Sequence, residues 1–233
     1  MVLTGSRKNS ARRRFSTKAK PVSEKAPIYF QMGADFVRGG AGLKLLNYDT
    51  VQKDHKGICA SPPWPTGQRT ANDGPWRFPV FVEAPRFLID RKLGRPPKDI
   101  EGVDGFWFVS SEMKAVLEAT DPAGCEFRPC ETVLASGDRG PERWLCTITR
   151  TFFDAVDFDA TEALLVGKYP NGVSSYTPTP RTKLRFRQDI VKGAHLFHVV
   201  EISSRTVYCD QIMKDACKTA GLKGIRFAET APR

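Results

Sequence analysis

The sequence predicts an α+β fold, in which one domain is built on a mixed β-sheet that carries a few short helices. The chain has 233 residues, enough for one sizeable core. Apolar residues make up 40% and charged residues 27%, as in globular domains. Strand-like runs alternate with helix signals, and two segments look like copies of one strand–helix–strand unit. No apolar run reaches the roughly 18 residues of a membrane span, so no membrane partner is expected.

The first 27 residues are predicted to be a disordered basic arm. Residues 1–20 contain seven cations and no acidic residue, and Pro21 and Pro27 close the segment. The formal net charge is +10, but without these seven cations 29 basic groups face 26 acidic ones. The arm lacks the apolar stretch of a secretory signal, although its composition also resembles a transit peptide. We therefore expect residues 28–233 to form one nearly neutral globular domain in the cytoplasm.

The segment before residue 105 gives weaker signals. Short apolar runs at 28–32 and 87–89 predict strands. Residues 56–77 are rich in Gly, Pro, Asn and Asp but hold two tryptophans, so a long ordered loop is expected. The alternation at 78–82 predicts an edge strand, because the proline inside it has no N–H to donate to a neighbouring strand. A Gly-Arg-Pro-Pro turn follows at 94–97.

The first strand–helix–strand unit begins at residue 106. The run Phe-Trp-Phe-Val at 106–109 predicts a strand, and Ser110 or Ser111 can cap the helix that follows. Apolar residues then repeat at helical spacing up to Leu117. An Asp-Pro-Ala-Gly stretch ends the helix, and residues 125–134 are interpreted as a strand.

The second unit lies near the C-terminus. A strand at 196–202 is followed by Ser203 and Ser204, which are interpreted as turn or cap residues. Apolar residues from Cys209 to Ala220 form a helical stripe that Gly221 ends, and a strand follows at 222–227. A crossover of this kind makes the flanking strands parallel, or near neighbours, in one sheet.

Further elements are expected between the two units. Residues 144–152 alternate as a strand does, and a capping box at 159–162 predicts a short helix after it. A loop is expected at 169–180 and a strand at 183–187. The side chains that these patterns place in the core are Phe106, Phe108, Val116, Leu117, Cys146, Ile148, Leu196, Val199, Ile212, Met213 and Ile225.

No local motif for catalysis, metal binding or a cofactor is present. The three histidines, His55, His195 and His198, show no ligand spacing, and no C-x-x-C pair or G-x-S-x-G elbow occurs. The glycine-rich residues 39–44 match no phosphate-binding loop. The six cysteines are expected to be free thiols. We therefore expect no catalytic residue, no metal and no cofactor, and a protein that is not an enzyme.

A row of basic residues is the best local candidate for a binding site. Arg181, Lys183, Arg185 and Arg187 stand at alternate positions, so on a strand they would line one face, opposite Leu184 and Phe186. Such a row can contact phosphates or the acidic patch of a partner protein. The alternative is that these residues form the solvated outer face of a half-buried strand.

Three stretches resemble a known bacterial family. They are DGPWRFPVFV at 73–82, GFWFVSS at 105–111, and AGLKGIRF at 220–227, and the resemblance covers roughly 73–229. Together they are similar to a domain family grouped with the predicted immunity proteins of polymorphic toxin systems, in the eleventh numbered class.

The resemblance implies a protein that binds a cognate toxin in the producing cell and neutralises it. It brings no catalytic residues with it, and it includes neither the basic arm nor the loop before residue 73. The second hypothesis is nucleic-acid binding through the arm and the Arg181–Arg187 row. The third hypothesis is an enzyme whose catalytic site assembles from residues distant in the sequence. The sequence leaves open the oligomeric state and the surface that contacts the toxin.

Overall fold

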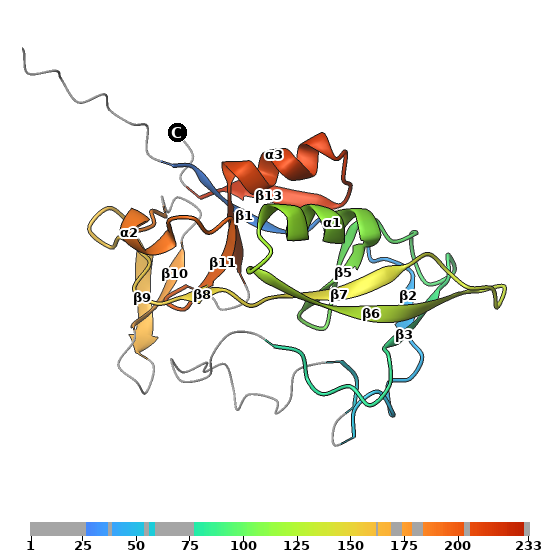
Figure 1. The fold of residues 1–233 in the computed structure, drawn as a ribbon. Coiled ribbons are helices and arrows are strands. Elements are labelled where there is room, and N and C mark those ends of the chain that lie inside the picture. The colour runs from blue at the N-terminus through green and yellow to red at the C-terminus, as the bar shows by residue number, and fades with distance from the viewer. Residues whose placement is uncertain are drawn as a thin grey trace, which may run out of the picture.

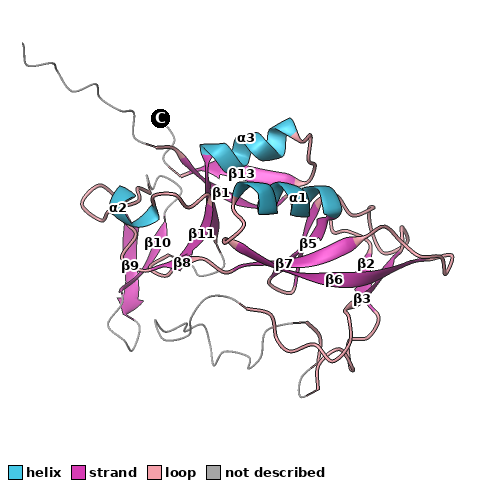
Figure 2. Ribbon diagram, viewed as in Figure 1, coloured by secondary structure: helices cyan, strands magenta, loops and turns pink. Residues whose placement is uncertain are grey.

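The computed structural model has the predicted α+β architecture, with mixed sheets and few, short helices (Figures 1 and 2). The 1–26 arm lies outside the described residues, which are 27–36, 39–53, 56–58, 77–161, 163–168, 174–178, 184–202 and 206–230. Within these residues the strands form two large sheets and one two-stranded ribbon. The ribbon pairs β9 (Ala163–Lys168) with β10 (Ser174–Pro178).

The first large sheet has six strands. In spatial order they are β2 (Leu43–Leu45), β3 (Arg86–Ile89), β6 (Cys125–Leu134), β7 (Arg143–Ile148), β5 (Phe106–Ser110) and β4 (Ile100–Val103). The pair β3 and β6 is parallel, whereas all other neighbours in this sheet are antiparallel. Because β3 and β6 run the same way, their carboxyl ends lie at one edge of the sheet.

The second large sheet has five strands. In spatial order they are β13 (Ile225–Glu229), β1 (Tyr29–Ala34), β12 (Val207–Asp210), β11 (Leu196–Val199) and β8 (Thr151–Phe152). The chain passes directly from the first sheet to the second where β7 ends and β8 begins. The strand expected at 144–152 is therefore two short strands that belong to different sheets.

The first strand–helix–strand unit forms as predicted. Helix α1 (Ser111–Thr120) begins after Ser110, whose hydroxyl oxygen accepts a hydrogen bond from the Met113 amide at 3.1 Å. Strand β7 pairs antiparallel with both β5 and β6. The two strands that flank α1 are therefore parallel to each other, with one antiparallel strand inserted between them.

The second unit also forms, but its predicted start is wrong. Helix α3 (Gln211–Thr219) is preceded by β12, and Asp210 caps it by accepting a hydrogen bond from the Met213 amide at 3.0 Å. Cys209 belongs to β12, although its spacing places it in phase with the helical stripe. Ser203 and Ser204 lie outside the described residues. Strand β1 pairs antiparallel with both β12 and β13, so this unit repeats the inserted-strand arrangement of the first.

Helices α1 and α3 lie side by side and cover one face of both sheets (Figure 1). One apolar cluster fills the space beneath them and draws on both sheets and both helices. The strand alternation decides which side chains belong to it: Trp107 and Val109 of β5 face the helices, whereas Phe106 and Phe108 face a second cluster on the opposite side. A third cluster, around Phe197, covers the other face of the five-stranded sheet.

Most of the predicted core is confirmed. Buried as expected are Phe106, Phe108, Leu117, Cys146, Ile148, Leu196, Val199 and Met213. Val116 and Ile225 are partly buried against the central cluster. The prediction for Ile212 is wrong, since 59% of this residue is exposed. It lies in the first turn of α3, where the neighbouring Met213 already faces the core.

Two predicted elements are also wrong. The capping box at 159–162 does not start a helix, because residues 163–168 form strand β9. Residues 78–82 form no strand. Phe78 and Phe81 pack against the cluster around Phe108, whereas Val80 and Val82 are 86% and 59% exposed. A bend at 82–83 breaks the alternation expected of a strand.

The carboxylate of Asp121 connects the two halves of the structure. This buried residue is the C-terminal cap of α1. One of its oxygens accepts hydrogen bonds from the amides of His195 at 2.9 Å and Leu196 at 3.0 Å, and it pairs with the guanidinium of Arg150. The three partners lie at the start of β11 and between β7 and β8, so one carboxylate joins α1, the sheet junction and the second sheet.

We predict that Asp121→Asn lowers the free energy of unfolding by about 3 kcal/mol, because Arg150 keeps its charge without the matching carboxylate. Urea denaturation measures this change. The matched control is Asp159→Asn, which alters an exposed carboxylate and should change stability by no more than about 0.5 kcal/mol. Equal effects of the two substitutions would contradict this role of Asp121.

We also predict that Ile212 and Met213, which are neighbours at the start of α3, differ sharply in their contribution to stability. Met213→Ala should lower the free energy of unfolding by about 2–5 kcal/mol, because Met213 is fully buried and its truncation leaves a cavity. Ile212→Ala removes an exposed side chain and should change stability by no more than about 0.5 kcal/mol. Thermal unfolding of both variants tests whether α3 has the orientation described.

Candidate functional site

The predicted basic row is only partly within the described residues. Arg181 and Lys183 lie outside them, whereas Arg185 and Arg187 are described. The alternation of faces is confirmed for this part: Leu184 and Phe186 are buried, and Arg185 is exposed. The segment is not a regular strand, since only an isolated bridge joins Phe186 to another segment. Its irregular backbone presents the arginines without the straight row of a strand.

Arg187 is held by carboxylates of the same molecule. Its guanidinium pairs with Asp154 at 2.5 Å and with Asp189 at 3.2 Å. The hydrogen bond that Arg187 donates to Asp189 and the charges of both carboxylates raise the pKa of Arg187, and the guanidinium in turn lowers the pKa of Asp189. Arg187 therefore has a role within the fold, next to the start of the short helix α2 (Gln188–Val191).

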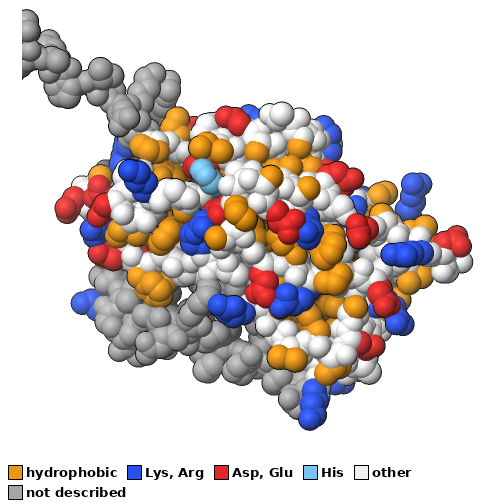
Figure 3. Space-filling view, in the orientation of Figure 1, with side chains coloured by type: hydrophobic (Ala, Val, Ile, Leu, Met, Phe, Trp, Pro, Cys, Tyr) orange, Lys and Arg blue, Asp and Glu red, His pale blue; other side chains and the backbone are white. Residues whose placement is uncertain are grey.

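The visible surface shows no concentrated basic area. In Figure 3, lysine and arginine side chains alternate with aspartate and glutamate over the face that carries α1 and α3. A polyanion that contacts many phosphates favours a continuous positive surface. Neither this face nor the described part of the basic row offers one.

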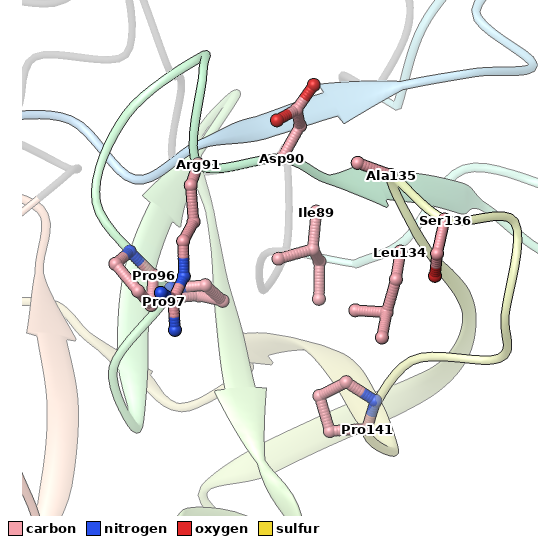
Figure 4. A pocket seen from close by; sticks show the side chains of 9 residues that line it. All are labelled: Ile89, Asp90, Arg91, Pro96, Pro97, Leu134, Ala135, Ser136 and Pro141. Atoms are coloured by element: carbon pink, nitrogen blue, oxygen red, sulfur yellow. The ribbon is translucent and has the colours of Figure 1, made fainter.

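A pocket opens at the edge where the parallel strands β3 and β6 end (Figure 4). Its volume is about 490 Å³, within the range of small-molecule and side-chain binding pockets. The residues that line it come from these strand ends and from two turns, and are Ile89, Asp90, Arg91, Pro96, Pro97, Leu134, Ala135, Ser136 and Pro141. Most of these side chains are aliphatic or proline rings.

Two buried or half-buried arginines fix the turn whose residues Pro96 and Pro97 form one wall of the pocket. Arg143 is 8% exposed and donates hydrogen bonds to the carbonyl oxygens of Lys98 at 2.6 Å and Pro97 at 3.4 Å. Its burial lowers its pKa. Arg95 forms a bidentate ion pair with Glu101, which also accepts a hydrogen bond from the Lys98 amide at 2.7 Å. These bonds preform the turn that carries Pro96 and Pro97.

One cation is directed into the pocket region. The Arg91 side chain extends toward Pro96 and Pro97 in Figure 4, and among the described residues it has no hydrogen bond or ion pair. Asp90 points away from the pocket and accepts a hydrogen bond from the Lys92 amide at 2.8 Å. The pocket thus combines apolar walls with a single guanidinium.

The sequence predicts the 94–97 turn but gives no sign of the pocket. No local signal connects this turn with residues 134–141, because the two meet only through the pairing of β3 with β6. The two prolines and the neighbouring arginine are a composition signal for a turn, and nothing in it indicates a cavity. The pocket is a product of strand order.

The described cysteine and histidine side chains are buried or hydrogen-bonded within the fold. The five described cysteines are free, and burial raises the pKa of Cys130 and of Cys217 to about 12, so their thiols stay protonated near neutral pH. His195 pairs through Nδ1 with Asp210 at 2.8 Å, and His198 contacts the Thr206 carbonyl at 2.9 Å. Across the described ranges, no group of three or more potential metal ligands comes together.

Glu201 is a buried carboxylate next to Asp154, the residue that pairs with Arg187. It is 5% exposed and accepts a hydrogen bond from the Asp154 amide, while its other oxygen has no partner among the described residues. Burial raises its pKa, and nearby backbone amides oppose this in part. The folded state therefore holds a proton on Glu201 more tightly than the unfolded chain does.

We predict that this proton makes stability depend on pH. The stabilisation is complete below the ordinary glutamate pKa of 4.5 and is lost as the pH rises through the raised pKa of the folded state. Glu201→Gln should abolish that loss. Urea unfolding of both proteins, from pH 4.5 to above neutrality, should show their difference in stability shifting in favour of the variant as pH rises. A difference that is constant over this range would contradict the prediction.

One known protein family matches most of the chain. The model of the immunity protein family Imm11 matches residues 29–231, from the first residue of β1 to just beyond β13. The chain belongs to the Imm11 immunity protein family. The match is longer than the 73–229 resemblance seen in the sequence, and it leaves the basic arm outside.

No curated protein matches the chain at a significant level. Among the described residues, no helix has both the length and the apolar character needed to cross a bilayer.

Proposed function

We propose that this protein neutralises a toxin of the producing cell by forming a stoichiometric complex with it in the cytoplasm. The observation that carries the proposal is the family match, which spans residues 29–231. An immunity protein of this kind acts by contact, so its function requires a stable, shaped surface rather than a reacting group.

The structure supports a binding role in two ways. The central cluster joins both sheets and both helices, which makes the body rigid enough to present a preformed surface. The pocket at the ends of β3 and β6 adds a concave apolar feature, and concave apolar features are common where proteins recognise ligands or partner side chains. The arm lies outside the family match, so the toxin contact is expected on the body.

We predict that the full chain forms a complex with the product of the adjacent gene. Co-expression followed by affinity purification and size-exclusion chromatography should recover both proteins together, and expression of this chain should restore growth to cells that produce the toxin. The control is the Met213→Ala variant, which should protect less because less of it is folded. Neither a complex nor growth protection with the neighbouring product would contradict the proposal.

A further inference from the structure

We propose that the pocket at the ends of β3 and β6 receives an acidic, apolar segment of the toxin. The segment would place an aliphatic or aromatic side chain against Ile89, Leu134 and Pro141, and a carboxylate against the Arg91 guanidinium. This inference rests on the proposed function and names the surface and the partner chemistry for it.

The shape of the pocket supports this occupant. A volume of about 490 Å³ accommodates one or two large side chains. Ile89 and Leu134 end two paired strands, and the prolines opposite them lie on a turn that Arg143 and the Arg95–Glu101 pair hold in place. A preformed apolar cavity binds a side chain with little loss of conformational entropy, which is how anchor residues at protein interfaces gain affinity.

The charges around the pocket support an acidic neighbour for that side chain. The turn at 90–93 and the loop at 135–142 carry three cations, Arg91, Lys92 and Arg139, none of which has an ion pair within the described ranges. Each of their three carboxylates accepts a hydrogen bond within the molecule: Asp90 from the Lys92 amide at 2.8 Å, Asp138 from the Ser136 hydroxyl at 2.7 Å and Glu142 from the Ser111 hydroxyl at 2.7 Å. A guanidinium binds a carboxylate with two parallel hydrogen bonds, so Arg91 selects an aspartate, a glutamate or a terminal carboxylate.

Nucleic acid fits this pocket less well than a peptide segment. Recognition of a nucleic acid strand uses several phosphate contacts and aromatic rings on which bases stack. The pocket offers one guanidinium and no aromatic ring. Apolar walls beside a single cation instead match a peptide that presents an apolar side chain and a carboxylate close together.

The test is the affinity of the full chain for the toxin encoded by the neighbouring gene, measured by isothermal titration calorimetry. Arg91→Glu and Arg91→Gln remove the cation, and Ala135→Trp fills the cavity without a change of charge. Each should weaken binding about tenfold or more. The matched control is Arg226→Glu, which changes another exposed arginine, on β13 of the other sheet, and should change affinity less than about twofold. Circular dichroism must show that all four variants keep the wild-type melting temperature.

A charge-reversal experiment tests the acidic partner directly. Each exposed aspartate and glutamate of the toxin is changed to arginine, and one such change should restore affinity for Arg91→Glu while it weakens binding to the wild type. If no reversal restores binding, the acidic occupant is wrong. If the wild type binds and the Arg91 and Ala135 variants bind equally well, the pocket is not the interface and the proposed function stands. If the wild type does not bind the toxin, both proposals fail.

Discussion

The buried carboxylate of Asp121 is the constraint on which the arrangement of the two sheets depends. A charge in the interior must be satisfied by hydrogen bonds and an opposite charge, and Asp121 finds them at the start of β11 and in Arg150. Because these partners belong to different parts of the chain, the end of α1 can occupy only one position relative to the second sheet. That position brings α1 beside α3 and lets one apolar cluster serve both sheets.

The repeated strand–helix–strand unit explains where the candidate site forms. In the first unit, β7 is inserted between β5 and β6, so β6 has its other edge free to pair with β3. That pairing is parallel, and it brings two strand ends and the loops that follow them to the same edge of the sheet. In the second unit the corresponding strand, β13, pairs with β1 alone among the described strands. This pocket thus depends on the strand that pairs beside the first unit.

The candidate site was predictable only in part. The alternation of Arg185 with buried Leu184 and Phe186 could be read from the sequence because it depends on the local backbone. The engagement of Arg187 by Asp154 could not, since those residues are separated by 33 positions along the chain. The sequence gives no signal for Arg91 for the same reason. An arginine in a turn becomes a candidate binding residue only when the pocket beside it is known.

The sequence was enough to predict the fold class, most of the core and the first helix with its Ser110 cap, because caps, turns and alternation depend on residues a few positions apart. It also carried the family resemblance. The folded structure was needed to show that Cys209 belongs to a strand rather than to α3, that residues 163–168 are a strand, and that β3 lies beside β6. These outcomes depend on pairing between distant segments, and pairing is selected by the packing of the whole core.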